Sequence, residues 1–466
     1  MVFSSISFIF IFLPVLLTVY FLSRANIRNY ILLLASIIFY AWGNPKYLII
    51  LLSTILTNYA GSIFLCKYPK YKKIILFLTI FVNLSILFYF KYFNFVITNI
   101  NHFMHSHFNI TEIILPIGIS FYIFQAMSYV IDVYRNKCSV QKNIFKLSLY
   151  ICLFPQLVAG PIIKYHDIES QIDNRPMNFS NFNLGIKRFI IGLAKKVLIA
   201  DTMGVIADKI FIQDPYTFSH LVAWLGAVAY SFQIFFDFSG YSDMAIGLGL
   251  IFGFKFAENF NYPYISKSLS EFWRRWHISL SSWFKEYLYI PLGGSKQGKL
   301  KQIRNLGIVF LITGIWHGAK WNFIIWGLWH ALFIIIEKII NIEKFPENKL
   351  INAGRNIYLC LVVMFGWVFF RSKDLLYAKE YLMNMLGFIK VNSADISFNI
   401  VYYVDVIEIL VFIAAILCSV PLNKNILEKD KPSTRLVVNT FLLFVFFLSV
   451  IKLASETYNT FIYFKF

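Results

Sequence analysis

Charged side chains are scarce in this 466-residue chain, since they make up 14% of it against about 25% in soluble domains. Hydrophobic residues reach 58%, and Phe, Trp and Tyr together make up 19%. A soluble domain cannot cover its surface with so few polar groups. The composition therefore excludes a soluble protein and predicts an integral membrane protein with many spans and short polar loops.

Acidic residues are few in comparison with basic ones. The chain has 43 Lys and Arg against 24 Asp and Glu, which gives a formal charge of +19. In a membrane protein this excess is expected from the positive-inside rule and from attraction to anionic lipid headgroups. Basic runs interleaved with stacking aromatic residues are missing outside the hydrophobic segments. We therefore expect membrane lipids as partners and exclude nucleic-acid binding.

Cysteine is rare, and the common cofactor motifs are missing. The five cysteines are scattered and form no CxxC pair, which excludes a disulfide framework and a zinc site built on cysteine. The HFMHSH segment at residues 102–107 has three histidines but no carboxylate placed to complete a metal site. P-loop, GxSxG, HExxH and dinucleotide-binding motifs are also missing. The sequence predicts no metal and no tightly bound cofactor.

Apolar stretches of span length follow one another along the chain. The first begins without the basic region of a signal peptide and lacks its cleavage site, so it is expected to be a span. We predict about eleven true crossings together with re-entrant or half helices. The fourteen candidate stretches are 5–23, 29–44, 47–66, 74–98, 113–133, 145–163, 187–206, 219–237, 240–255, 304–318, 321–340, 355–371, 401–421 and 435–453.

The charges of the early loops predict the orientation of the chain. The loops after the first, third and fifth stretches carry ten basic residues, whereas the loops between them carry only Lys46. The positive-inside rule then places residues 67–73 in the cytoplasm and residues 93–112 outside it. The N-terminus is accordingly expected on the extracytoplasmic side.

The longest stretch that is neither a span nor a simple loop is residues 256–303. Its sequence NFNYPYISKSLSEFWRRWHISLSSWFKEYLYIPLGGS mixes charged side chains with Trp, Phe and Tyr. This mixture predicts an interfacial or re-entrant amphipathic helix over 267–294, ended by Pro291 and Gly293. A helix that only anchors the chain at the lipid surface is an equal alternative.

The segment GIWHGAKWNFIIWGLWHALFIII, residues 314–336, places His317 within an apolar run. An ionisable residue at membrane depth is costly and is a candidate functional residue by default. A neutral imidazole can accept a proton near neutral pH, so His317 is a candidate general base. Trp321 shares its face if the helix is continuous. His330 falls near the opposite face and is expected to be a hydrogen-bonded packing residue.

Two aspartates, Asp237 and Asp243, lie six residues apart in apolar sequence. Buried carboxylates need partners, and Arg274 and Arg275 are the expected ones. We favour structural ion pairs, and a proton relay through the aspartates is the alternative. The PQLVAGPI segment, residues 155–162, breaks an apolar stretch and predicts the lining of an interior pocket.

These motifs resemble the membrane-bound O-acyltransferase family, and within it the alginate O-acetyltransferase branch. The resemblance rests first on FWRRWHISLSSWFKEYLYIPLGGS, followed about 40 residues later by GIWHGAKWNFIIWGLWHA. Further matching segments are LLLASIIFYAWGNPKYLIILLSTILTNY, LPIGISFYIFQAMSYVIDVYR, PQLVAGPI, FFDFSGYSDMAIGLGLIFGFKFAENFNYPY, FGWVFFRS and the closing FIYFKF. The resemblance covers nearly the whole chain, so we treat 1–466 as one integral-membrane domain.

The resemblance implies an all-α polytopic membrane fold, with helices in a ring around a thin centre that holds a tunnel. His317 falls on the family's catalytic histidine, and His277 falls on its second, supporting histidine. The further positions expected to line the tunnel or to support it are Asp237, Tyr241, Asp243, Arg274, Arg275, Trp276, Trp316, Trp321 and Asn322.

The resemblance also implies an activity in the bacterial cytoplasmic (inner) membrane. An acetyl group would pass from a cytoplasmic thioester, either acetyl-CoA or an acyl carrier, to hydroxyls of an extracytoplasmic polysaccharide such as alginate. An esterase-like partner protein is expected outside. Peptidoglycan O-acetylation and D-alanyl transfer to teichoic acid are alternatives within the family. A transporter or flippase for the donor or the glycan, and a scaffold, are alternatives of other classes; only an enzyme yields a new ester.

Overall fold

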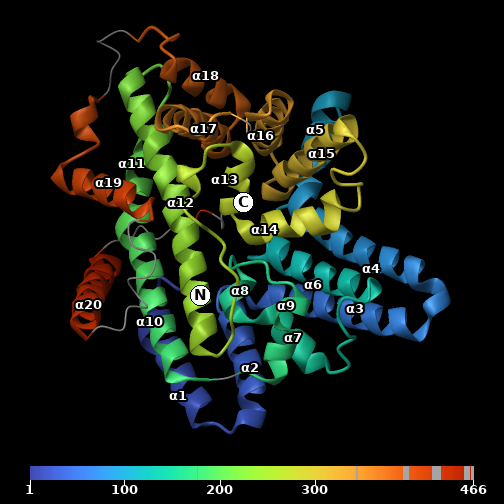
Figure 1. Cartoon of the computed structure of the whole chain (residues 1–466). Coiled ribbons are helices and arrows are strands. Elements are labelled where there is room, and N and C mark those ends of the chain that lie inside the picture. The colour runs from blue at the N-terminus through green and yellow to red at the C-terminus, as the bar shows by residue number, and fades with distance from the viewer. Residues whose placement is uncertain (176, 343–344, 392–397, 422–431, 456–461, 463–466) are drawn as a thin grey trace. The chain divides into compact units, whose positions relative to one another are not determined.

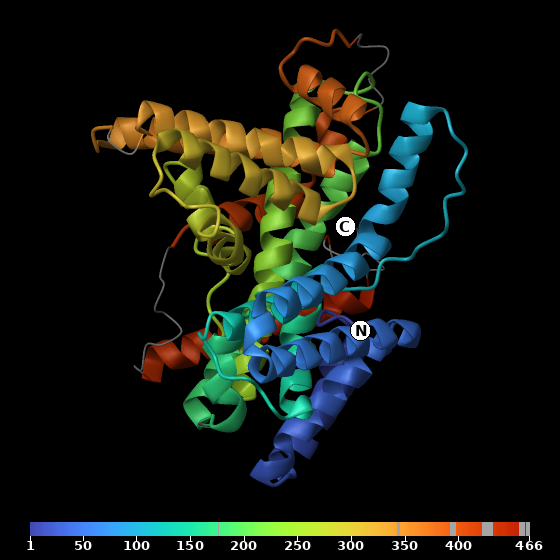
Figure 2. The same cartoon turned by 90° about the vertical axis from the view of Figure 1, so that its right-hand side faces the viewer.

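The computed structural model describes residues 1–466 except 176, 343–344, 392–397, 422–431, 456–461 and 463–466. The described residues form helices joined by loops and contain no strand (Figures 1 and 2). The predicted all-helical fold is confirmed.

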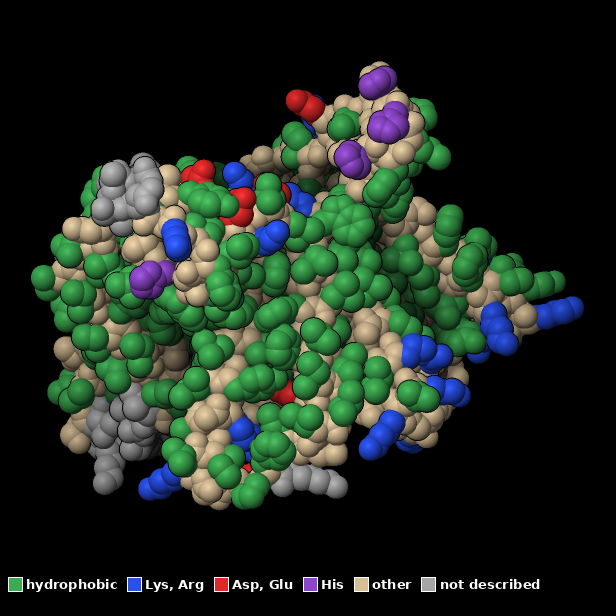
Figure 3. All heavy atoms as spheres, turned by 90° about the horizontal axis from the view of Figure 1, so that it is seen from above, with side chains coloured by type: hydrophobic (Ala, Val, Ile, Leu, Met, Phe, Trp, Pro, Cys, Tyr) green, Lys and Arg blue, Asp and Glu red, His purple; other side chains and the backbone are tan. Residues whose placement is uncertain are grey.

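Six helices within the described ranges are long and apolar enough to cross a membrane. They cover residues 45–67, 69–104, 220–251, 321–340, 349–371 and 435–455. Three shorter apolar helices cover residues 8–22, 25–41 and 406–418. Large hydrophobic side chains are exposed along several of them, and Figure 3 shows hydrophobic side chains across much of the surface in that view. A chain with these features is a multi-pass membrane protein; the figure of eleven crossings stays a prediction.

The first of two compact units comprises residues 1–190 and 241–257. Nearly every side chain of α6 is buried there, and α6 packs against α3 and α4, as Figure 1 shows. The helices are α1 (Leu13–Leu22), α2 (Arg28–Ala41), α3 (Leu48–Lys67), α4 (Lys72–Leu87), α5 (Phe93–Met104), α6 (Ile119–Tyr134), α7 (Ile144–Cys152), α8 (Phe154–Leu157), α9 (Tyr165–Asp173) and the first part of α10 (Phe179–Ala194).

The apolar segment around residues 155–162 is broken, as predicted. Helix α7 ends at Cys152, the short α8 follows, and residues 158–164 are not helical. Buried side chains satisfy the backbone groups freed by the break. The Phe154 N–H donates to Ser36 Oγ (3.1 Å), and the Tyr150 hydroxyl donates to the Ile163 carbonyl (2.8 Å). Irregular backbone is therefore tolerated here because protein groups pair with it.

The second unit comprises residues 191–240 and 258–466. Helix α16 packs against α15, α17 and α13, and Figure 2 shows α15 and α16 side by side. The core of the second unit is rich in aromatic side chains. Besides the end of α10 and the π-helical turn at Lys195–Ala200, the elements are α11 (Asp201–Phe211), the part of α12 (His220–Ile251) up to residue 240, α13 (Leu269–Arg275), α14 (Ile278–Phe284), α15 (Lys299–His317), α16 (Trp321–Ile340), α17 (Lys349–Arg371), α18 (Leu375–Met385), α19 (Val406–Cys418) and α20 (Pro432–Ser455).

The two stretches predicted at 219–237 and 240–255 are one continuous helix, α12. The glycine between them, Gly240, does not end the helix. A Cβ added there would lie 2.7 Å from the carbonyl oxygen of Gly192, so this position needs glycine for close approach of backbones.

Candidate active site

His317 is the last residue of α15, and the chain turns there into α16. Gly318 follows in an extended conformation, and α16 begins at Trp321. The two helices approach closely because Gly314 faces the Phe323 carbonyl; a Cβ at Gly314 would lie 2.3 Å from that oxygen. The continuous helix that would have placed Trp321 beside His317 is therefore not formed. Trp321 is 47% exposed, whereas His317 is buried.

Aromatic rings surround the imidazole of His317. Its ring centroid lies 4.9 Å from Trp316, 4.9 Å from Trp326 and 5.2 Å from Phe370, all with edge-to-face geometry. These rings fix the imidazole by packing and keep bulk water away from it. The predicted buried position of His317 is confirmed.

His277 lies between two short helices, not within one amphipathic helix over 267–294. Helix α13 ends at Arg275, His277 adopts a left-handed backbone conformation (φ 43°, ψ 55°), and α14 begins at Ile278. The carboxylate of Glu337 on α16 accepts hydrogen bonds from the first backbone N–H groups of α13. His277 is only 1% exposed. The alternative of a helix that only anchors the chain at a lipid surface is therefore wrong.

Hydrogen bonds hold one side of the His277 ring. Its Nδ1 lies 3.2 Å from Oδ1 of Asn259, and the same oxygen accepts from the backbone N–H and the hydroxyl of Ser279. The ring also packs edge-on against Phe238, with centroids 4.6 Å apart. His277 lies outside the six candidate spans, and its burial lowers its pKa to about 3. The imidazole is therefore neutral at physiological pH.

The structure brings the two predicted histidines onto one indole. The Trp316 ring lies 6.3 Å from His277 and 4.9 Å from His317, centroid to centroid. Both histidines belong to the second unit, so this arrangement is internal to it. Trp316 therefore connects the two residues that the resemblance singled out.

His330 also joins this aromatic cluster, contrary to expectation. Because α16 folds back along α15, His330 packs on Trp326 (5.0 Å), the same indole that contacts His317. The single-helix argument that put the two histidines on opposite faces is wrong, since the helix ends at His317. Neither ring nitrogen of His330 has a hydrogen-bond partner among the described residues. The expected hydrogen-bonded packing role is therefore not found.

The predicted ion pairs between Arg274 or Arg275 and the two aspartates are not formed. Arg275 instead pairs with Glu271 one turn earlier (2.8 Å), and Arg274 is exposed. Asp237 pairs with Lys196 (3.1 Å), which also contacts Asp201 in a buried cluster. In the first unit, Asp243 pairs with Arg188 (2.8 Å).

Helix α10 and the π-helical turn after it supply both cations, Arg188 and Lys196. Six residues along a helix turn about 240° beyond a full turn, so Asp237 and Asp243 point in different directions and need different partners. Charges within the predicted span 187–206 were the sequence signal for this pairing, because cations in an apolar stretch need anions. Nothing comparable in the sequence points to Asn259, Ser279 or Glu337.

The remaining predicted site residues have structural contacts. Trp276 stacks on Phe272 with centroids 5.4 Å apart. Asn322 donates to the Ser372 carbonyl (2.6 Å) and so joins the start of α16 to the end of α17. In the first unit, Tyr241 stacks on Phe3. Lining of a tunnel by these residues stays a prediction.

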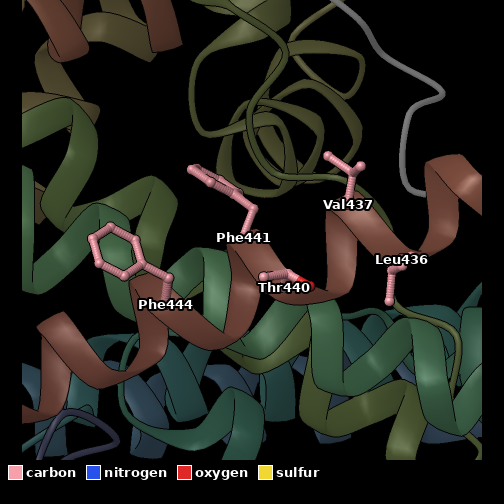
Figure 4. A pocket seen from close by; sticks show the side chains of 5 residues that line it. All are labelled: Leu436, Val437, Thr440, Phe441 and Phe444. Carbon is pink, nitrogen blue, oxygen red and sulfur yellow. The ribbon is translucent and has the colours of Figure 1, made fainter.

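Two surface hollows lie apart from this chemistry. One, of about 540 Å³, runs along α20 (Figure 4), and the other, of about 330 Å³, lies in the first unit. No ionisable side chain lines either of them. Within the described ranges, no group of three His, Cys, Asp or Glu side chains is placed to hold a metal ion. The hollow on α20 is lined by Leu436, Val437, Thr440, Phe441 and Phe444.

Comparison with known proteins agrees with these motifs. The sequence profile of MBOAT, the membrane-bound O-acyltransferase family, matches residues 34–372, and the chain belongs to this family. It is therefore an O-acyltransferase, as predicted, and the transporter and scaffold alternatives lose their basis.

Among its relatives, "Probable alginate O-acetylase AlgI" of Pseudomonas putida is 40% identical over the full length of both chains. The protein of the same name from Azotobacter vinelandii is also 40% identical over both full lengths. The peptidoglycan O-acetyltransferase of Helicobacter pylori is 39% identical, over 85% of this chain and 82% of that protein.

Proposed function

We propose that this protein transfers an acetyl group from a thioester on the cytoplasmic side to hydroxyl groups of an extracytoplasmic polysaccharide, of the alginate type. The observation that carries the proposal is the pair of buried histidines, His277 and His317, that meet on Trp316. Relatives with full-length similarity are named for O-acetylation of alginate. Acetyl-CoA and an acyl carrier present the same thioester, so either fits as donor, and no tightly bound cofactor is needed.

In this proposal His317 acts as the general base. The acceptor hydroxyl attacks the thioester carbonyl while Nε2 or Nδ1 of the imidazole takes its proton. The tetrahedral intermediate collapses to the new ester and expels the thiolate, which recovers the proton from the imidazolium. Positioned bases of this kind contribute about 10²–10⁴-fold to the rate. The rings of Trp316, Trp326 and Phe370 keep water from hydrolysing the thioester.

We further propose that His317 lies at the thin centre of a ring of about eleven spans, where a tunnel lets donor and acceptor meet from opposite sides. The N-terminus is then extracytoplasmic, in the bacterial inner membrane. An esterase-like partner outside completes transfer to the polymer.

Peptidoglycan is the second candidate acceptor. The Helicobacter pylori relative is named for it at nearly the same identity as the alginate relatives. The two acceptors present the same chemistry, a sugar hydroxyl, to the same base. D-alanyl transfer to teichoic acid has weaker support, since the Bacillus subtilis relative named for it is 30% identical over 54% of this chain.

Ester-linked acetate measured separately on secreted polysaccharide and on purified peptidoglycan tests the proposal. Cells that carry His317→Ala should lose the ester from one polymer while the protein stays in the membrane. His107→Ala, at an exposed histidine, is the matched control and should leave the ester unchanged. Wild-type ester levels on both polymers in the His317→Ala strain would reject the role of this site.

Labelling with an impermeant maleimide tests the orientation. In a chain freed of its own cysteines, a cysteine at Ser106 should react in intact cells, or in spheroplasts where an outer membrane is present. A cysteine at Tyr71 should react only after the membrane is opened. The reverse pattern would place the N-terminus in the cytoplasm.

A further inference from the structure

Asn259 is a fully buried residue in the loop before α13, and its polar atoms gather around His277. Its side-chain oxygen lies 3.2 Å from His277 Nδ1 and accepts from the Ser279 hydroxyl (2.9 Å) and the Ser279 backbone N–H (3.2 Å). Its backbone carbonyl accepts from the Ile278 N–H (2.9 Å). One residue therefore holds both the ring of His277 and the backbone that follows it.

The Ser279 backbone N–H determines which atom of the Asn259 amide faces His277. A backbone N–H can only donate, so the side-chain atom that it meets must be the amide oxygen and not the nitrogen. An oxygen opposite Nδ1 stabilises a proton on Nδ1. In a neutral imidazole the lone pair is then on Nε2.

The backbone conformation of His277 also depends on Asn259. Its left-handed conformation (φ 43°) is uncommon for a residue with a side chain, and such conformations persist where the surroundings impose them. The hydrogen bonds from Ile278 and Ser279 to Asn259 impose this conformation directly after the ring. The turn between α13 and α14, which contains His277, is thus held by Asn259.

We propose that Asn259 is a positioning residue that holds His277 in its neutral Nδ1–H tautomer, so that Nε2 of His277 presents its lone pair as a hydrogen-bond acceptor. This inference rests on the proposed function for the use of that lone pair, but the tautomer itself does not depend on it. Phe238, Phe260 and Trp316, whose rings do not titrate, pack on His277, and the Ser279 hydroxyl lies 3.5 Å from Nδ1. His317 also packs on Trp316.

Nitrogen NMR of the full-length protein in lipid, with ¹⁵N-labelled histidine, tests the tautomer directly. The His277 signals are identified by their loss in His277→Gln. The wild type should show a protonated Nδ1 and an unprotonated Nε2 from about pH 5 to about pH 8, the range in which ordinary histidines titrate. A protonated Nε2 in the wild type would overturn the proposal.

Substitutions of Asn259 and Ser279 distinguish the effect of the Asn259 side-chain oxygen from that of altered packing. Asn259→Ala should yield a mixture of tautomers. Asn259→Asp keeps the acceptor but adds a negative charge, which favours imidazolium, so the neutral form should require higher pH. Ser279→Ala removes one donor to the same oxygen and a hydroxyl 3.5 Å from His277 Nδ1, but it keeps the Asn259 oxygen and the backbone N–H, so Nδ1–H should remain the major tautomer. An unchanged tautomer in Asn259→Ala would also overturn the proposal.

Ester-linked acetate in cells relates the tautomer to the reaction. Asn259→Ala should lower acetylation, but by no more than His277→Ala does, because the mixture of tautomers keeps part of the Nε2 lone pair. The double variant should be no lower than His277→Ala alone, because Asn259 acts through that ring. Additive losses would show that Asn259 acts other than through His277 and would reject the positioning role. A tautomer that changes as expected with full acetylation in both single variants would leave the positioning intact and reject the proposed use of His277.

Discussion

The two histidines that share Trp316 are held by different kinds of contact. A hydrogen bond between Nδ1 and the Asn259 oxygen fixes the His277 ring, whereas three aromatic rings pack edge-on against the His317 ring. A hydrogen bond to a fixed oxygen selects one tautomer and opposes movement of that proton. Edge-on packing of aromatic rings fixes the position of the His317 imidazole. The difference suits a supporting acceptor at His277 and a base at His317 that gains and loses a proton in each cycle.

Replacing each histidine by alanine should give the largest effects and should rank them. His317→Ala should lower ester-linked acetate by at least about 10²-fold, because it removes the base itself. His277→Ala should lower it less, since it removes only a supporting acceptor. Both are measured per amount of protein in the membrane. Equal losses would mean that both imidazoles take part in proton transfer, and the contrast between them would disappear.

Lys196, Asp201 and Asp237 form a buried charge cluster close to His277. Asp237 precedes Phe238 on α12, and Phe238 packs on the His277 ring. Lys196→Met should lower the free energy of unfolding by about 3–5 kcal/mol, since it leaves two carboxylates buried without their cation. Asp237→Asn should cost less, because Lys196 keeps Asp201.

Arg275→Met is the matched control for Lys196→Met, because its partner Glu271 is on the same helix and both are partly exposed. It loses that pair and a hydrogen bond to the Asn261 carbonyl (3.1 Å), and should cost at most about 1.5 kcal/mol. Yield of folded protein after extraction and its thermal midpoint measure both variants. If Arg275→Met destabilised the protein as much as Lys196→Met, burial of the ion pair would not explain the loss of stability.

Close packing of α15 on α16 holds His317 in place at the end of α15. Gly314→Ala should destabilise the protein by about 1–3 kcal/mol and lower acetylation, because the new methyl group meets the Phe323 carbonyl one turn before His317. Gly307→Ala on the same helix has open space around it and should be neutral or stabilising by up to about 1 kcal/mol. The thermal midpoints of the pair show the difference. A neutral Gly314→Ala would mean that the helix pair can separate without moving His317.

The sequence predicted the helical fold, the broken segment at 155–162 and the burial of His317, since each depends on local composition. The sequence failed where the path of the chain decides neighbours. The end of α15 at His317 brings His330 back onto Trp326. The end of α13 at Arg275 divides the predicted interfacial or re-entrant helix into two short helices, with His277 buried between them. Asn259 was missed because a polar residue in a loop has no periodicity, and only the fold shows that it contacts a residue 18 positions later.

Substitution of His330 should have the smallest effect of these changes, and it tests whether His317 is the one reacting histidine in the aromatic cluster. Its two ring nitrogens have no hydrogen-bond partner among the described residues, so it already carries the cost of a buried polar group. His330→Leu removes that cost and loses some ring contacts with Trp273 and Trp326. The two terms oppose each other, and the free energy of unfolding should change by no more than about 1 kcal/mol.

Acetylation in His330→Leu should stay at the wild-type level, because Trp326 still packs on His317. The same change at His277 removes the hydrogen bond between Nδ1 and the amide oxygen of Asn259 and should cost more by comparison. If His330→Leu abolished acetylation at a normal thermal midpoint, His330 would belong to the reaction, and the aromatic cluster would hold two reacting imidazoles instead of one.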